Sequence, residues 1–384
     1  MQSGRIAVID RMRGIALFGI LLVNMMSFHS PILYMDAVKH WDTGLDSIIF
    51  FFIDVFVQGS FYPLFALVFG YSLSLMMERV AGRGLLFYKI ALRRFTVLLM
   101  IGALHIVLVW HGDILVTYAI CGFMLLIWMK LSGKVLVWLG SLFYAIPNIL
   151  LFFTLLFLWR MMPSEMALPQ NVESIRQSME IYANGSFAEI TSLRMKDWGF
   201  ANLGSFLQFF ISILPFFMMG VGAAKCKLFE NVDCYKGKVA AFSIVMFLIG
   251  TAFKLLPFLL ESNIFTVYSQ DMLGGPLQAF SFAGFIALTG KKKYSDIFSA
   301  AGKISLTIYL SQSIILSFLF YGYGFGLYGK VTLTEGTMIA ICLYVLQLLF
   351  SRWWVKQYYY GPVEWLLRAG SYWSLPKWKR ERNL

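Results

Sequence analysis

The stretch RRFTVLLMIGALHIVLVWHGDILVTYAICG, residues 93–122, decides the fold because it predicts two membrane-spanning helices joined by a tight turn. At about 1.5 Å of rise per residue, the step from Arg94 to His105 covers roughly 16 Å, about half of a hydrocarbon core of about 30 Å. His105 is therefore expected near the middle of the membrane. An ionisable side chain at that depth is costly and normally faces the protein interior or a wet cavity, so His105 is a candidate functional residue.

The turn of this hairpin supplies a second candidate. Gly112 and Asp113 interrupt the apolar run, and Asp113 is predicted to be the N-cap of the next helix, where a carboxylate meets the positive helix end. His105 lies roughly 9–12 Å along the axis below the turn, so a direct contact requires the chain to bend at Gly112. In the alternative, His105 only bonds a neighbouring helix and Asp113 only caps. Their occurrence together favours a joint function, with His111 as the alternative partner.

The composition extends this prediction to the whole chain. Of 384 residues, 59% are hydrophobic and only 14% are charged, whereas soluble proteins average about 25% charged residues. The apolar stretches run nearly unbroken for about a helical span, whereas a barrel would alternate in segments of about ten residues. The sequence therefore predicts an all-α, polytopic helical integral membrane protein that is surrounded by membrane lipids.

Ten spans are expected, and the basic residues orient them. The predicted spans are residues 14–33, 48–77, 95–111, 114–129, 135–159, 203–224, 239–260, 274–290, 303–321 and 336–352. With both termini in the cytoplasm, all but seven of the 32 Lys and Arg residues fall on the inner side, as the positive-inside rule requires. The seven exceptions are Lys39, Arg160, Arg176, Arg194, Lys196, Lys254 and Lys330. The net charge of +12 is thus a topology signal, and no nucleic-acid partner is expected.

A polar connector at residues 161–199 divides the chain into an N-terminal five-helix half, residues 1–160, and a C-terminal five-helix half, residues 200–384. Apolar residues recur in the connector at helical spacing, which indicates an amphipathic helix on the membrane surface or over an opening; a solvated connector is the alternative. These residues are Val172, Ile175, Met179 and Tyr182. Five spans followed by five of opposite orientation are also typical of many secondary transporters.

The second span contains polar and helix-breaking residues, which indicate either two joined pieces lining a cavity or a simple proline kink. They are Asp54, Gly59, Ser60 and Pro63.

The four histidines all fall on the outer half of the predicted bundle. His29, His40 and His111 lie at outer span ends, and His105 lies deeper. Imidazole beside a carboxylate is the pair that takes a proton from an acceptor hydroxyl or amine near neutral pH. Carboxylates near these histidines are Asp36, Asp42, Asp46, Asp54 and Asp113. The spacing matches no metal motif, so no metal is expected, and the predicted catalytic residues are His105, Asp113, His40 and His111.

On the predicted cytoplasmic side, basic residues gather against the starts of the first and third spans. They are Arg11, Arg13, Arg93 and Arg94, with Asp10 beside them. They are either anchors that follow the positive-inside rule or a basic mouth for a phosphorylated donor.

Four motifs give the chain a family resemblance. They are R-x-x-x-x-D-R-M-R-G-I-A-L-F-G-I-L-L-V-N at residues 5–24, H-x-V-L-V-W-H-G-D-I-L-x-x-Y-A-x-x-G at 105–122, GKISLTIYLSQS at 302–313 and GPVEWLLR at 361–368. Together they resemble the bacterial YeiB-like family, domain of unknown function 418. That family is distantly similar to transmembrane acyltransferases of the heparan-alpha-glucosaminide N-acetyltransferase type, which move an acetyl group from cytoplasmic acetyl-CoA to an acceptor across the membrane.

The resemblance implies specific roles. Asp10, Arg13 and Gly14 match the D-x-x-R-G pattern that precedes the first span of those enzymes, and His40 lies in the loop that carries their catalytic histidine. The donor site it implies consists of Asp10, Arg13, Asn24, Arg93 and Arg94, and the location it implies is the bacterial cytoplasmic membrane. Ser60 departs from the relatives, many of which have lysine there.

Two functions from different classes therefore stand. The first is a membrane-bound O- or N-acyltransferase that uses acetyl-CoA as donor and a small-molecule, lipid or glycan acceptor. The alternative is a transporter or exporter of a small molecule or lipid, in which the midplane His105 relays protons. A non-catalytic scaffold is a third interpretation, and the oligomeric state stays open between a monomer and a homodimer.

Overall fold

The computed structural model describes residues 7–203, 206–290 and 296–380, and regular secondary structure in these residues is helical. The helices of the N-terminal half are α1 (Ala7–His29), α2 (Ala37–His40), α3 (Gly44–Phe56), α4 (Phe61–Ala81), α5 (Phe87–Leu108), α6 (Leu115–Leu125) and α7 (Gly133–Met161). The connector and the C-terminal half hold α8 (Val172–Asn184), α9 (Phe187–Leu203), α10 (Phe206–Lys225), α11 (Lys236–Lys254), α12 (Leu256–Leu259), α13 (Ile264–Ser269), α14 (Gly275–Leu288), α15 (Asp296–Lys303), α16 (Ser305–Phe320), α17 (Leu333–Gln357) and α18 (Pro362–Tyr372). The all-α prediction is confirmed.

Several of these helices have the length and composition of membrane spans. Within the described residues, five segments are long and apolar enough to cross a membrane, and a sixth qualifies if the bent pair α15 and α16 counts as one span. The five are residues 44–81, 87–108, 133–161, 232–254 and 333–357. Large apolar side chains such as Leu150, Phe153 and Phe157 on α7 are exposed, as expected of surfaces that face lipid rather than water. The count of ten spans and the orientation stay predictions.

The expected break in the second span is present. Helix α3 ends at Phe56 and α4 begins at Phe61. Gly59, between them, has a φ of +68°, and a Cβ atom there would lie 3.0 Å from Oδ1 of Asp271. Glycine adopts this left-handed conformation without steric cost, so it allows the break to pack closely against the C-terminal half.

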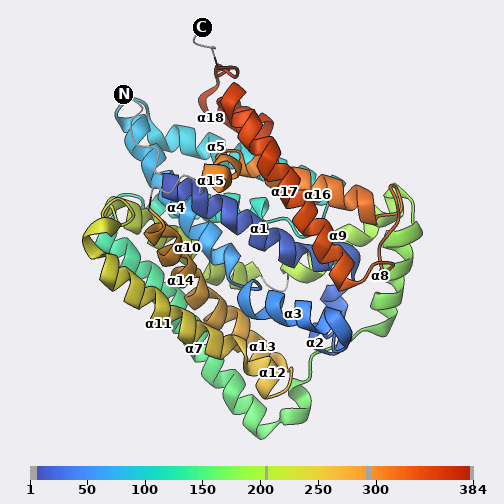
Figure 1. Ribbon diagram of the computed structural model, residues 1–384. Coiled ribbons are helices and arrows are strands. Elements are labelled where there is room, and N and C mark those ends of the chain that lie inside the picture. The colour runs from blue at the N-terminus through green and yellow to red at the C-terminus, as the bar shows by residue number, and fades with distance from the viewer. Residues whose placement is uncertain (1–6, 204–205, 291–295, 381–384) are drawn as a thin grey trace.

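The connector is helical around residues 172–182, where α8 covers Val172–Asn184; whether it lies on a membrane surface stays a prediction. Its α8 joins other loops that are predicted to lie outside: the Asn171 backbone N–H donates to the Tyr34 carbonyl at 3.0 Å, and the Gly322 N–H donates to the Tyr182 carbonyl at 2.7 Å. In Figure 1, α2, α8 and α12 all lie at the end of the bundle away from the labelled N and C termini. The loops predicted to be outer thus gather at one end.

At the opposite end, two motif glycines bring helices into backbone contact. A Cβ on Gly14 of α1 would lie 2.1 Å from the Phe298 carbonyl oxygen, and a Cβ on Gly302 would lie 1.7 Å from the Asp10 carbonyl oxygen. Small residues allow such close helix packing in membranes. The D-x-x-R-G and GKISLT motifs therefore meet at the α1–α15 contact.

The remaining C-terminal motif holds the start of α16. The Glu364 carboxylate accepts from the Leu306 N–H at 2.6 Å, from the Thr307 N–H at 3.1 Å and from the Thr307 hydroxyl at 2.6 Å. Helices α15 and α16 are bent by 85° at this point, so the first turn of α16 has no preceding helical carbonyls and needs an outside acceptor.

The two halves share one core. Helix α10 packs on α4 and α7, and α1 packs on α15, α16 and α17. The largest cluster of buried apolar side chains includes Leu21 and Phe95 from the first half and Phe217 and Leu316 from the second. The division at residues 161–199 therefore describes the order of the helices along the chain rather than two separate cores.

We expect Gly14→Ala and Gly302→Ala each to destabilise the protein by about 1–3 kcal/mol or more, because the added methyl group forces α1 and α15 apart. Gly237→Ala is the matched control, since no atom lies within 4 Å of a Cβ at that position of α11. Thermal unfolding in detergent measures all three. Equal melting temperatures for Gly14→Ala and Gly237→Ala would contradict the close contact.

Candidate functional site

His105 and Asp113 meet directly inside the bundle. His105 lies in the last turn of α5 and Asp113 lies just before α6, yet Nδ1 of His105 and Oδ2 of Asp113 are 2.8 Å apart. The two side chains are 1% and 0% exposed. The other carboxylate oxygen accepts the Val116 N–H at 2.9 Å. Asp113 therefore bonds the first turn of α6 from one residue before the N-cap, which is Ile114 rather than Asp113 as predicted, and it holds the imidazole at the same time. The two interpretations of this residue are compatible.

A folded-back loop produces this contact. Helix α5 ends at Leu108, and the Trp110 N–H donates back to the His105 carbonyl at 3.0 Å. Gly112 lies against the Trp110 ring, where a Cβ would come within 2.2 Å of a ring carbon. The chain bends between these residues, and Asp113 returns to the level of His105. The bend expected at Gly112 therefore spans residues 109–113.

Besides Gly112, a second glycine of this hairpin makes room for the Asp113 carboxylate. A Cβ on Gly102, one turn before His105 on α5, would lie 2.9 Å from Oδ1 of Asp113 and 2.8 Å from the Val116 nitrogen. The missing side chain allows the first turn of α6 to rest on the backbone of α5.

The contact with Asp113 leaves the second ring nitrogen of His105, Nε2, unused. Nε2 is buried and has no hydrogen-bond partner among the described residues. The ring of Tyr309, on α16, lies 5.5 Å from the imidazole, and its hydroxyl donates to the Gly112 carbonyl at 3.4 Å. The contact with Asp113 assigns the ring proton to Nδ1, so Nε2 carries a lone pair. An imidazole with a free lone pair and an orienting carboxylate has the chemistry required of a general base.

His111 belongs to a different environment. Its Nε2 lies 3.4 Å from the Ser27 hydroxyl, and its buried Nδ1 has no partner in the part of the chain that the structure describes. The residue lines a small pocket with Asp197 and Tyr34 beneath α8 and α9. Asp113 bonds His105, not His111, so the structure separates the two candidate bases.

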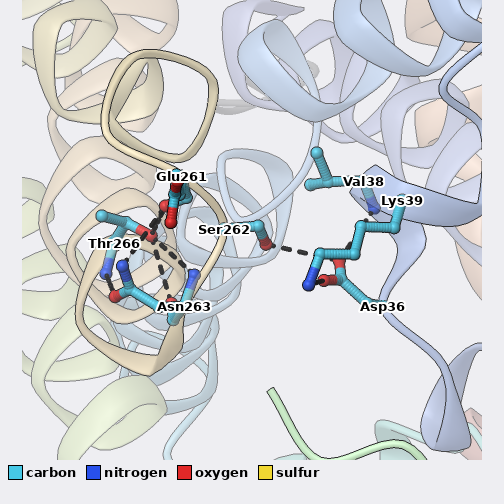
Figure 2. Close-up of polar contacts among 7 residues, drawn as sticks. All are labelled: Asp36, Val38, Lys39, Glu261, Ser262, Asn263 and Thr266. Atoms are coloured by element: carbon cyan, nitrogen blue, oxygen red, sulfur yellow. Dashed lines mark hydrogen bonds and ion pairs between the residues drawn. The ribbon is translucent and has the colours of Figure 1, made fainter. Parts of the chain in front are cut away.

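His40 lies away from both. It is exposed at the end of α2, and its ring is 5.3 Å from that of Trp41. The neighbouring Asp36 caps α2 at the Val38 N–H, pairs with Lys39 at 3.3 Å and accepts the Ser262 hydroxyl at 3.3 Å (Figure 2). Asp36 thus ties the loop after α1 to the loop between α12 and α13, which has a capping box of Asn263 and Thr266 (Figure 2). Its role is structural.

Two other outer candidates, Asp46 and His29, also make hydrogen bonds within the described residues. Asp46 accepts the Thr334 N–H at 2.9 Å and the Leu333 N–H at 3.2 Å, so it holds the start of α17. His29 is buried, with Nδ1 2.7 Å from the Ser30 hydroxyl.

The residues predicted to bind a donor lie together only in part. Arg13 pairs with Asp10 at 3.1 Å and also bonds Ser72. Arg94 lies within electrostatic range of Arg13 and Arg368. This basic cluster, Arg13, Arg94 and Arg368, joins α1, α5 and α18.

The other two residues of that set lie outside the basic cluster. The Arg93 guanidinium stacks over Trp373, 4.3 Å from the ring centre. Asn24 lies on α1 about three turns from Arg13.

A further ionic cluster was not predicted. Lys254 is fully buried at the end of α11, where its Nζ donates to the Gln58 carbonyl at 2.7 Å and lies 3.6 Å from Oδ1 of Asp271. Asp54 bonds the Gln270 side chain, at the start of a π-helical segment, Gln270–Gly274. The sequence signal was a lysine at the end of an apolar span. By sequence, Lys254 was predicted only to be one of the exceptions to the positive-inside rule.

Comparisons with known proteins find relatives of unknown activity. The family model described as "Protein of unknown function (DUF418)" matches residues 223–374, which include Lys254, Tyr309 and Glu364. The "Uncharacterized protein YxaH" of Bacillus subtilis (strain 168) is 31% identical over 400 residues, which cover 97% of this chain and 96% of that protein. The "Uncharacterized protein YeiB" of Escherichia coli (strain K12) is 28% identical over 388 residues and 95% of each chain.

The contact between His105 and Asp113 predicts strong energetic coupling. In a double-mutant cycle with His105→Gln and Asp113→Asn, we expect a coupling of about 1–3 kcal/mol, because either change leaves a buried polar partner unpaired. Thermal unfolding of the two single variants and the double variant in detergent measures it. The control cycle pairs Asp113→Asn with His40→Gln, which should be additive. Additivity in both cycles would disprove the coupling.

Proposed function

The chain belongs to the DUF418 family, and within that family we propose that it is an integral membrane acyltransferase that moves an acyl group from cytoplasmic acetyl-CoA to an extracytoplasmic or lipid-linked acceptor. The observation that carries this proposal is the buried pair His105 and Asp113, with the lone pair of Nε2 unengaged. Buried imidazole with an orienting carboxylate is the arrangement used to activate a hydroxyl or amine nucleophile.

The reaction assigned to this pair balances without a metal or redox partner. His105 Nε2 accepts the proton of the acceptor hydroxyl or amine as its oxygen or nitrogen attacks the thioester carbonyl. The bond between carbon and sulfur breaks, and the proton passes from the imidazolium to the departing thiolate. Asp113 keeps the proton on Nδ1 and stabilises the imidazolium.

The donor would approach from the opposite end. The basic cluster Arg13, Arg94 and Arg368 offers guanidinium groups suited to the phosphates of acetyl-CoA. Along α5, Arg94 and His105 are about 16 Å apart, so the extended pantetheine arm has to carry the acetyl group through the bundle towards His105.

The topology proposed with this function has ten spans and both termini in the cytoplasm of a bacterium, in its cytoplasmic membrane. Its support is the grouping of loops: the α1 start, α15 and α18 lie at one end, and the loops joined by the pairs Tyr34–Asn171 and Asp36–Ser262 lie at the other. The positive-inside rule places the first group in the cytoplasm.

Transfer of radiolabelled acetyl groups from acetyl-CoA to membrane material in vesicles tests the enzyme. We expect His105→Gln and Asp113→Asn each to lower the rate about 10²–10⁴-fold, with a double variant no slower than the worse single one. Asparagine can still cap α6, so Asp113→Asn should fold. His40→Gln should retain full activity. Loss of transfer in His40→Gln with normal transfer in His105→Gln would move the base to the outer loop and refute the assignment.

Binding of the donor is tested separately from turnover. Millimolar acetyl-CoA should raise the melting temperature of the purified protein, because a ligand that binds only the folded state stabilises it. Arg94→Gln should reduce this shift, while Lys134→Gln, at the start of α7, should leave it intact. The absence of any shift in the unaltered protein would count against an acetyl-CoA site.

Transport is the second candidate, and the ionic cluster around Lys254 favours it. A buried lysine, two carboxylates, a broken span and a π-helical turn meet at one place, as in the ion-coupling sites of transporters. Proteoliposomes with a pH gradient distinguish the two functions. A transporter moves its substrate unmodified and loses uptake in Lys254→Met, whereas the enzyme releases an acylated product.

A further inference from the structure

A cavity of about 470 Å³ lies between α8, α9 and the turn after α1. This volume falls in the range of pockets that hold small ligands, about 300–1,000 Å³. Gln170, Asn171 and Gln177 line it and are exposed, so the cavity opens at the surface. It lies at the end of the bundle away from the chain termini, where α8 and α9 are seen in Figure 1.

The lining is mixed and nearly uncharged, with apolar surface from Leu33, Pro169 and Leu193 beside the polar groups. It combines three amide side chains and the hydroxyls of Ser174 and Ser178 with the rings of Tyr34 and Phe200, whose centres are 5.5 Å apart. Lys196 is the single charged side chain among the lining residues described. Amides and hydroxyls both donate and accept hydrogen bonds, whereas an anion would require several cations. A ligand that fits this lining has both hydroxyl groups and an apolar face.

Ser178 connects this cavity with a second, small pocket that reaches His111. It lines both, is 1% exposed, and its hydroxyl has no partner among the described residues. The buried Nδ1 of His111 is also unpartnered. Two buried polar atoms without partners cost free energy unless something supplies hydrogen bonds to them.

The carboxylate beside the small pocket is already engaged. The two carboxylate oxygens of Asp197 accept the Tyr34 hydroxyl at 2.7 Å and the Tyr182 hydroxyl at 2.6 Å. Arg194 donates to the Val107 carbonyl at 2.6 Å, which fixes α9 against α5 two residues from His105. The cavity is therefore held directly above the His105 hairpin.

We propose that this cavity binds the ring of an uncharged sugar, either free or as the headgroup of a glycolipid, with Ser178 as the hydrogen-bonding floor. A sugar ring presents hydroxyls to amides and serines and an apolar face to aromatic rings, which is the combination that the lining offers. The proposal deepens the acyltransferase function, on which it rests for its role, by assigning the acceptor to sugars. The binding itself does not depend on acyl transfer.

The test measures binding in the absence of acetyl-CoA. Methyl β-D-glucoside, observed by saturation-transfer NMR, probes a free sugar, and monoglucosyl-diacylglycerol in nanodiscs, observed by native mass spectrometry, probes a lipid-linked one. Phosphatidylglycerol in nanodiscs is the anionic control. We expect one or both sugar probes to bind. If both bind, each should displace the other, whereas phosphatidylglycerol should displace neither.

Variants locate the binding site. Gln177→Ala and Ser178→Ala should each weaken sugar binding about two- to tenfold, as expected for one lost hydrogen bond. Ser178→Ala should not lower the melting temperature, because its hydroxyl has no protein partner to lose among the described residues. Glu180→Ala, on α8 but outside the lining, is the control and should bind normally.

The outcomes separate this inference from the proposed enzyme. Unchanged binding in Ser178→Ala and Gln177→Ala, displacement by phosphatidylglycerol, or no binding of either sugar probe overturns the sugar site, even if acyl transfer is found. Normal sugar binding in His105→Gln together with absent transfer in the unaltered protein would retain the site and refute the enzyme.

Discussion

Helix starts inside this bundle need acceptors for their backbone N–H groups, and acidic side chains supply them, from the preceding turn for α6 and from distant segments for α16 and α17. Asp113 holds the start of α6, Asp46 that of α17 and Glu364 that of α16. An unpaired N–H in an apolar medium costs several kcal/mol, so each carboxylate fixes both a helix and the segment that carries it. The candidate base depends on this constraint, because the group that orients His105 is also the group that caps α6.

The parts of the fold that sequence analysis predicted are those governed by local patterns. Apolar runs gave the helices, Gly59 and the polar residues near it gave the break in the second span, and the spacing of Val172, Ile175 and Met179 gave α8. His105 and Asp113 could be paired because they lie on one hairpin, where the chain has few ways to fold. The resemblance to the YeiB-like DUF418 family is confirmed by the comparisons, whereas the distant similarity to acyltransferases stays an expectation.

The parts that were missed depend on contacts between distant segments. The packing of α11, α3 and the π-helical turn brings together Lys254, Asp54 and Asp271. No local pattern in the sequence predicts that these residues are close in space. The pocket shared by Ser178 and His111 was also missed, because it is formed only by the packing of α8 on the rest of the bundle. Conversely, Arg93 and Asn24 suited a donor site by sequence position alone. In the structure Arg93 stacks over Trp373, and Asn24 lies about three turns along α1 from Arg13.

The glycine contacts between α1 and α15 also govern how the chain is made. Helix α1 is the first to leave the ribosome, while the backbone that it must touch, around Phe298 and Gly302, is synthesised near the end. Because domains fold during synthesis at about 5–20 residues per second, α1 spends tens of seconds in the bilayer without its closest neighbour. Arg11, which is buried in the folded protein, then lacks two of its acceptors, the Thr289 hydroxyl and the Gly290 carbonyl. The start of α1 therefore reaches its final hydrogen bonding only after α14 and the turn that follows it have been made.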